Sequence, residues 1–383
     1  MKEKKRKERQ SNNVDIAASS VFLLFIHLII VRFNDLPNRN KLGGRGAILD
    51  IAPPPPRILV MSQNQYTVDT YKHIWATCPI IFQATIASCD CPPALEIRPC
   101  FCSTDSLTGF ISLECHHRTG EPISEAIQRV SSKGVNVELI EINSDWLREI
   151  DERFFGTLPV KLIRIKAPQL HHIDENTFHN QKESLMQLHL TQTNLKSLPL
   201  ETISFLEKLD TLEVSFSNLE VLPSFGNMSS AHLLKKLYLN NNYVTTLFNN
   251  TFGPELTSLQ LLDLSHNKID EIESPTFLQG LPISHLYLQN NRLTEIPKQL
   301  QNLENRAFVN MESNLIEEMD KLNLLKLLNK NIYTEFEGNP TNCDCSIAFL
   351  VVSHKNIYGK CVSPSRLTGK YFYQLTLKDF SNC

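Results

Sequence analysis

Residues 259 to 272 read LQLLDLSHNKIDEI, and this stretch decides the fold. Leu259, Leu262 and Leu264 precede Asn267 in a fixed order: apolar, two variable residues, apolar, one variable, apolar, two variable, Asn. The same order recurs between residues 137 and 319, with Asn replaced in some copies. The second apolar position of the copies is occupied by Ile140, Ile163, Leu188, Leu212, Leu237, Leu262, Leu286 and Val309. Successive copies lie 23 to 25 residues apart, so the region is a tandem repeat.

The spacing inside one copy indicates a short strand followed by a turn. Leu262 and Leu264 are separated by one residue and point to the same face of a strand, while Asp263 points to the other. The side-chain amide of Asn267 can satisfy backbone groups that the turn would otherwise bury. One repeat cannot bury its own apolar face, so stacked copies share a core. The period is typical of leucine-rich repeats, and it predicts an α/β-type solenoid, a horseshoe whose parallel strands line the concave face.

The cysteines lie only outside the repeats. The sequence has 10 of them, at 78, 89, 91, 100, 102 and 115 before the array and at 343, 345, 361 and 383 after it. This placement predicts disulfide-bonded caps at both ends and an oxidising compartment. Zinc is disfavoured because Cys100 and Cys102 are separated by one residue, whereas zinc-ligand pairs usually leave two to four.

Both cysteine clusters resemble the caps of extracellular leucine-rich-repeat proteins. The amino-terminal cluster reads CPPALEIRPCFC from Cys91, and the carboxy-terminal one reads GNPTNCDCSIAFL from Gly338. The resemblance implies that the first cysteine of each cap pairs with the third and the second with the fourth. The implied bridges are Cys91–Cys102, Cys100–Cys115, Cys343–Cys361 and Cys345–Cys383.

A closer resemblance involves the first cap and the segment that follows it. The order Cys-Pro-Pro-x-x-x-Ile-x-Pro-Cys-x-Cys precedes a helical-looking insert over residues 122–132. Together they resemble the arthropod group named after the non-catalytic subunit of the Oplophorus luciferin monooxygenase. This resemblance implies no luciferase chemistry in the chain.

The first 89 residues are expected to direct the chain to its compartment. A basic start precedes an apolar run from Ile16 to Val31, which as a helix is about 24 Å long, shorter than the roughly 30 Å hydrocarbon core. It fits a signal peptide or a short signal anchor, and either would place the repeats outside the cell. The alternatives are therefore a secreted protein and a type II anchored one.

A second segment, from Met61 to Cys89, also reads like a signal peptide. Two interpretations stay open: translation begins at Met61, or residues 1–60 are an ordinary leader. The predicted organisation is a leader and Pro-rich linker over 1–60, a candidate signal peptide over 61–89, an amino-terminal cap over 90–136, repeats over 137–337 and a carboxy-terminal cap over 338–383. Asn227 and Asn249 begin glycosylation sequons, which agrees with export.

Charge and motifs argue against several functions. The net charge of −3 is uneven, because residues 1–89 are basic and the remainder is acidic. An acidic solenoid is a poor partner for nucleic acid. His116–His117 and His171–His172 belong to no catalytic or metal-binding motif, and no nucleophile elbow is present. We therefore expect no enzyme activity, no cofactor and no metal.

The expected function lies on the concave face. The residues between inward apolar positions are, in order, Glu141, Arg164, His189, Glu213, Tyr238, Asp263, Tyr287 and Asn310. Aromatic residues gather in the later repeats, and they dominate interface energetics. The predicted site for a protein or peptide partner consists of Tyr238, Leu261, Asp263, His266, His285, Tyr287 and Phe308. Strand surfaces also tolerate Tyr and His without a function.

Two other functions remain as alternatives to a binding protein. They are a non-catalytic subunit that stabilises a secreted enzyme and an extracellular matrix component.

Overall fold

The computed structural model describes residues 91–117, 122–249, 251–273, 281–353 and 356–383. All of them belong to the second of two compact units, Lys72–Cys383. The leader, the candidate signal peptide with its alternative start at Met61, and Cys78 and Cys89 lie outside the described residues.

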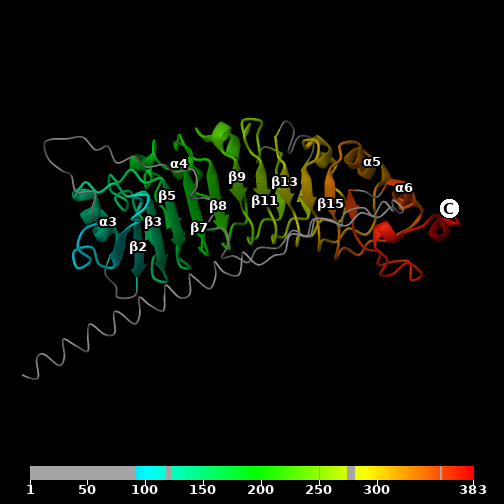
Figure 1. Cartoon of the computed structure of the whole chain (residues 1–383), viewed down its shortest axis with the longest axis horizontal. Helices are drawn as coiled ribbons and strands as arrows, with labels where there is room; N and C mark the ends of the chain where they lie inside the picture. Colours follow the sequence, from blue (N-terminus) through cyan, green and yellow to red (C-terminus); the bar gives the residue numbers. More distant parts are fainter. Residues whose placement is uncertain (1–90, 118–121, 250, 274–280, 354–355) are drawn as a thin grey trace, which may run out of the picture. The chain divides into compact units, whose positions relative to one another are not determined.

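One twelve-stranded sheet runs through the repeats, with its strands in chain order (Figure 1). All neighbouring strands pair in parallel except β1 and β2, which are antiparallel. The predicted parallel horseshoe is confirmed. The strands are β1 (Cys100–Thr104), β2 (Ile111–His117), β3 (Leu139–Ser144), β5 (Leu162–Lys166), β7 (Gln187–Thr191), β8 (Thr211–Ser215), β9 (Lys236–Tyr238), β11 (Leu261–Asp263), β13 (His285–Tyr287), β14 (Phe308–Asn310), β15 (Tyr333–Glu335) and β16 (Ile357–Tyr358).

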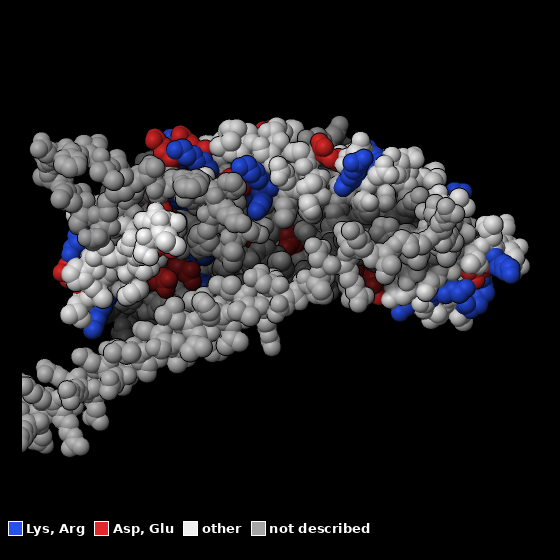
Figure 2. All heavy atoms as spheres, in the orientation of Figure 1, with Lys and Arg blue, Asp and Glu red and all other residues white. Residues whose placement is uncertain are grey.

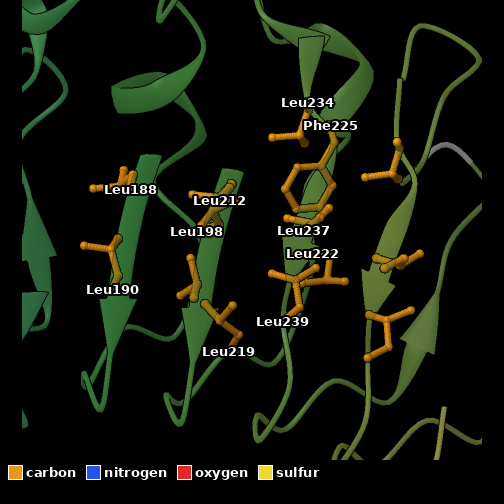
Figure 3. Close-up of a cluster of buried hydrophobic side chains, with 14 of the residues drawn as sticks. Leu188, Leu190, Leu198, Leu212, Leu219, Leu222, Phe225, Leu234, Leu237 and Leu239 are labelled. Atoms are coloured by element: carbon orange, nitrogen blue, oxygen red, sulfur yellow. The ribbon is translucent and has the colours of Figure 1, made fainter. Parts of the chain in front are cut away.

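Leucine-rich layers fill the core behind this sheet. Leu188 and Leu190 of β7 point inward, as do Leu237 and Leu239 at β9, and Phe225 closes the far side (Figure 3). Each of the five is fully buried. Burying a leucine contributes about 1.5–3 kcal/mol, so the shared core is the main source of stability. On the far side, aromatic rings of successive repeats stack, as Phe225 does on Phe252 with 5.6 Å between ring centroids.

An asparagine ladder connects the turns. The Nδ2 atom of Asn267 donates to the carbonyls of Leu239 and Leu264, both at 3.0 Å, and its Oδ1 accepts from the backbone of Val244 at 3.2 Å. Equivalent bonds are made by Asn242, Asn291, Asn314 and Asn339. These side chains satisfy buried backbone groups, each of which would cost about 1–3 kcal/mol if left without a partner.

Helices and short turns cover the rest of the core. Helix α3 (Ile123–Ser132) buries Ile123, Ala126, Ile127 and Val130, in agreement with the helical reading of residues 122–132. The others are α4 (Leu200–Ile203), α5 (Lys321–Asn329), α6 (Leu350–Ser353) and the 3-10 helices η2 (His179–Gln181), η3 (Phe225–Asn227), η4 (Ala231–Leu233), η5 (Lys298–Asn302), η6 (Cys345–Ile347), η7 (Phe372–Gln374) and η8 (Leu377–Phe380). Among the described residues, no helix has the length and apolarity needed to cross a membrane.

Two small parallel sheets lie in the segments that follow the main strands. One pairs β4 (Glu149–Ile150) with β6 (His172–Ile173), and the other pairs β10 (Thr246–Leu247) with β12 (Glu271–Ile272). They hold successive repeats together beyond the large sheet.

Disulfides close both ends of the array. The bridges join Cys91 to Cys102, Cys100 to Cys115, Cys343 to Cys361 and Cys345 to Cys383, which is the pairing implied by the resemblance. At the amino-terminal end β1 covers the edge of β2, with Cys100 opposite Cys115. An exposed edge would offer unpaired backbone groups to other chains, so this hairpin protects the first repeat.

The structure contains one more repeat than the eight counted in the sequence. Strand β15 pairs with β14 in the same register, with Val309 opposite Thr334, and Asn339 takes the ladder position. The sequence count was too low because Thr334 stands where the other copies have an aliphatic residue. It is fully buried nevertheless.

Candidate binding surface

The sheet register aligns the outward residues of the strands in columns on the concave face. The central column contains Glu141, Arg164, His189, Glu213, Tyr238, Asp263, Tyr287, Asn310, Glu335 and Tyr358. The first column, two residues earlier in each strand, contains Lys236, Leu261, His285, Phe308 and Tyr333. The positions two residues after the central column, just beyond the ends of these strands, form a third column with Gln289, Glu312, Glu337 and the buried Ser265.

Six of the seven predicted site residues occupy adjacent positions in the first two columns. Leu261, His285 and Phe308 follow one another in the first column, and Tyr238, Asp263 and Tyr287 do so in the central one. The Phe308 ring lies 5.9 Å from that of Tyr287, edge to face, and 6.3 Å from that of His285. We call these six residues, with His266, the aromatic patch.

His266 lies at the rim of this patch rather than on a strand. Its φ of 55° places it in the left-handed region, like Phe216 and Asn290 at the same position of other repeats. The residue follows β11, and its Nε2 atom lies 3.4 Å from Nδ2 of Asn290. The predicted site groups His266 with strand residues, and the structure places it in the turn that follows β11.

The amino-terminal half of the face pairs its charges. Arg164 lies 3.7 Å from Glu141, and Nδ1 of His189 lies 2.7 Å from Oε2 of Glu213. Burial alone would raise the pKa of Glu213, but the hydrogen bond and charge of His189, with help from Ser215 and Arg164, bring the pKa below its usual value. Glu141 and Glu213 therefore each have a basic side chain beside them within the fold, Arg164 and His189.

The carboxyl group of Asp263 is shielded from solvent within the aromatic patch. Burial raises the pKa of Asp263 above its usual value, and hydrogen bonds from Ser265 together with the charge of His266 offset this only in part. The Ser265 hydroxyl and backbone amide donate to its Oδ1 at 2.6 and 2.9 Å. Two hydrogen bonds from Ser265 therefore fix the position of Oδ1 of Asp263.

Three glutamates, Glu312, Glu335 and Glu337, lie next to the aromatic patch and were not predicted from the sequence. Nδ2 of Asn310 donates to Oε2 of Glu312 and to Oε2 of Glu335, each at 3.2 Å. Burial raises the pKa of Glu335, and the charges of Glu312 and Glu337 raise it further. The signal was present in the sequence, because extending the repeat register by one copy places Glu335 beside Asn310.

His171, His172, Asn227 and Asn249 lie away from the concave face, whereas His116 is an exposed residue of β2 in the large sheet. His171 and His172 are exposed beside Glu149 in the β4–β6 sheet. Across the part of the chain that the structure describes, no group of three or more His, Cys, Asp or Glu side chains is arranged to hold a metal ion. Asn227 ends η3 and Asn249 follows β10, and both are exposed and outside the large sheet.

These features define a class of protein. The chain is a leucine-rich-repeat protein with disulfide-bonded caps at both ends, and the family model described as leucine rich repeat matches residues 232–293. Among individual proteins, it is similar to the Oplophorus-luciferin 2-monooxygenase non-catalytic subunit of Oplophorus gracilirostris. The two are 26% identical over 219 residues, which is 54% of this chain and 56% of that protein.

Two further similarities are more partial. Lumican of Rattus norvegicus is 30% identical over 164 residues, covering 41% of this chain and 46% of lumican. The chain therefore spans about half of the length of these curated relatives. A solved structure of the Toll–Spätzle complex of Drosophila matches with a TM-score of 0.50 and 20% identity, covering 63% of this chain and 35% of that one. This last match shows a common fold.

Proposed function

We propose that this chain is an extracellular binding protein that recognises a protein or peptide through the aromatic patch on its concave face. The observation that carries the proposal is the contact of Phe308 with Tyr287 and His285, three rings from adjacent strands. Aromatic side chains bury a large area with few rotatable bonds, so a continuous group of them is suited to be the centre of an interface.

The surroundings of the patch support this role. The sequon asparagines Asn227 and Asn249 are exposed outside the large sheet, so glycans on them would leave the concave face open. The Toll–Spätzle structure, which shares the fold, is by its name a complex of two proteins. Four disulfides fit an oxidising compartment, where a secreted chain and a type II anchored chain would both expose their repeats.

A second candidate function follows from the relative in Oplophorus gracilirostris. Its name describes a non-catalytic subunit, so the present chain is an alternative candidate for a subunit that stabilises a secreted enzyme. The same patch would then contact the catalytic partner. Enzyme activity of the chain itself is not part of either proposal.

Capture from conditioned medium distinguishes these possibilities. The tagged full-length chain is expressed in secreting animal cells, and the proteins bound to it are compared with those bound to a Tyr238→Ala/Tyr287→Ala variant. A partner retained by the wild type and lost from the variant supports the concave face as the site. A stoichiometric enzyme among such partners favours the subunit role, whereas retention of the chain in insoluble matrix favours a structural one. Capture of the same partners in equal amounts by the wild type and the variant would exclude the aromatic patch as the binding site.

A further inference from the structure

The concave face changes its electrostatic character along the array. Its amino-terminal half contains the pairs Glu141–Arg164 and His189–Glu213. Strands β13, β14 and β15 contribute no Lys or Arg, and no ion pair among the described residues includes Glu312, Glu335 or Glu337. Figure 2 shows acidic groups in the recessed part of the molecule and both acidic and basic groups along its rims. The carboxy-terminal half of the face is therefore negative without internal compensation.

The fold holds two of these carboxylates together instead of separating them. Asn310 is nearly buried and donates one hydrogen bond to Glu312 and one to Glu335, so both carboxylates are oriented from below by the same amide. Lys360, which follows β16, forms no ion pair with the described carboxylates, and its ammonium group lies over the Tyr371 ring at 5.3 Å from the centroid. Burial raises the pKa of Glu335, the like charges of Glu312 and Glu337 raise it further, and a cation from outside would relieve the repulsion among them.

Aromatic rings stand beside these carboxylates. Phe308 and Tyr333 are neighbours in the first column, and 42% of the Tyr333 surface is exposed. Tyr358 follows Glu335 in the central column. Tyr333 and Glu335 lie on β15, and Glu335 is opposite Tyr358 in the register, so the three side chains are neighbours on this face. Burial raises the pKa of Tyr358, and Tyr333 and Glu335 raise it further. A guanidinium group can stack on an aromatic face while it donates hydrogen bonds to a carboxylate, so rings and acids in this arrangement suit arginine and lysine side chains.

We propose that the concave face of β13 to β16 binds a protein segment rich in arginine or lysine, with Phe308 and Tyr333 as the apolar contacts and Glu312, Glu335 and Glu337 as the counter-charges. This inference rests on the proposed function and specifies the chemistry of its partner. The partner is a basic polypeptide, because its positive charge complements the three glutamates. The aromatic rings also offer an apolar contact area, which an inorganic ion would not use. A second copy of the chain is disfavoured, since the region after residue 89 is itself acidic.

The test uses three synthetic peptides of equal length that differ only at alternating positions, which hold Arg, Glu or Ser. Their binding to the full-length protein is measured by fluorescence anisotropy at low and physiological salt. We expect the Arg peptide to bind, with an affinity that falls as salt rises, and the Glu and Ser peptides to bind at least tenfold more weakly, a difference of about 1.4 kcal/mol. Light scattering on the same samples detects self-association.

A matched pair of variants locates the interaction. Glu312→Gln/Glu335→Gln/Glu337→Gln removes the three acids, and Glu220→Gln/Glu295→Gln/Glu304→Gln makes the same charge change at exposed positions outside the sheet. The first should weaken binding of the Arg peptide at least tenfold, and the second by about twofold or less. If circular dichroism shows that the first variant is misfolded, the single variant Glu337→Gln, at an exposed side chain, replaces it. A second readout is the pKa of Glu335, followed by NMR, which should fall when the Arg peptide binds.

Several results would overturn the inference. The wild type could fail to bind the Arg peptide, or bind the Ser peptide equally well. The two triple variants could lose equal affinity for the Arg peptide. Light scattering could also show self-association that is abolished by Glu312→Gln/Glu335→Gln/Glu337→Gln and not by the control variant. None of them would affect the proposed function, which depends on capture through Tyr238 and Tyr287 and stands if an uncharged or acidic partner is captured in that way.

Discussion

Nδ1 of His189 lies 2.7 Å from Oε2 of Glu213, and this contact joins neighbouring strands across the concave face. The Ser215 hydroxyl donates to the other carboxylate oxygen, Oε1, at 2.5 Å. The side chain of Glu213 is 25% exposed and that of His189 is 17% exposed, so the interaction is largely shielded from solvent. Glu213 thus links β7 to β8 and is hydrogen-bonded at both of its carboxylate oxygens.

This contact predicts that stability depends on pH. The pKa of Glu213 is lowered in the folded state, so its contribution is fully present above the usual value of 4.5 and is lost as the pH falls through the folded-state pKa. At neutral pH, Glu213→Gln should reduce the free energy of unfolding by about 1.5–3 kcal/mol, the usual contribution of a hydrogen bond to a charged group. The difference in the free energy of unfolding between Glu213→Gln and wild type should decrease as the pH falls below 4.5.

Thermal melts of both proteins between neutral and acidic pH measure this effect. Glu220→Gln is the control, since Glu220 is exposed and belongs to none of the ion pairs among the described residues. A difference between Glu213→Gln and wild type that stays constant over the whole range would show that the lowered pKa is not coupled to folding.

The repeat core predicts a second result. Leu264 is fully buried midway along the array, so Leu264→Ala should cost about 2–5 kcal/mol by leaving a cavity. Each repeat contacts only its neighbours, so hydrogen exchange should increase in the flanking repeats before the caps. Leu322→Ala is the matched control, because Leu322 is 68% exposed. Equal melting temperatures for the two variants would contradict the inward register of Leu264.

The caps predict an order of disulfide contributions. The Cys345–Cys383 bridge spans 38 residues, compared with 11 for Cys91–Cys102, and a longer loop restricts the unfolded chain more. Replacing both cysteines of the longer bridge by Ser should cost about 1 kcal/mol more than replacing those of the shorter one. Chemical denaturation of the two double variants measures the difference. The same or the opposite order would mean that the loop-closure model does not describe these caps.

The sequence predicted the repeated parts of the fold because periodicity determines which residues share a layer. Leu262 and Leu264 had to point inward together, and Asn267 had to meet the turn, once the period was recognised. Thr334 broke the pattern at a core position, so the ninth repeat and its Glu335 were missed. The strand β1 and the left-handed turn at His266 follow from local backbone geometry, which the apolar period does not encode. The contact of Asn310 with two glutamates required the register of three consecutive strands.

The aromatic patch predicts the position of the partner, and the test is the loss of two rings. Tyr238 and Tyr287 occupy the central column on either side of Asp263, and both are half-buried on the sheet face that points away from the leucine core. Tyr238→Ala/Tyr287→Ala should keep the circular dichroism spectrum and reduce the affinity for the captured partner at least tenfold, about 1.4 kcal/mol. Tyr243→Ala/Tyr373→Ala, which removes two exposed tyrosines outside the strands of the large sheet, should leave the affinity unchanged. Measuring binding and circular dichroism on the same preparation separates the two effects. Wild-type affinity in a folded Tyr238→Ala/Tyr287→Ala protein would move the site to another surface, and an equal loss in both double variants would mean that the tyrosines act through stability and not through contact.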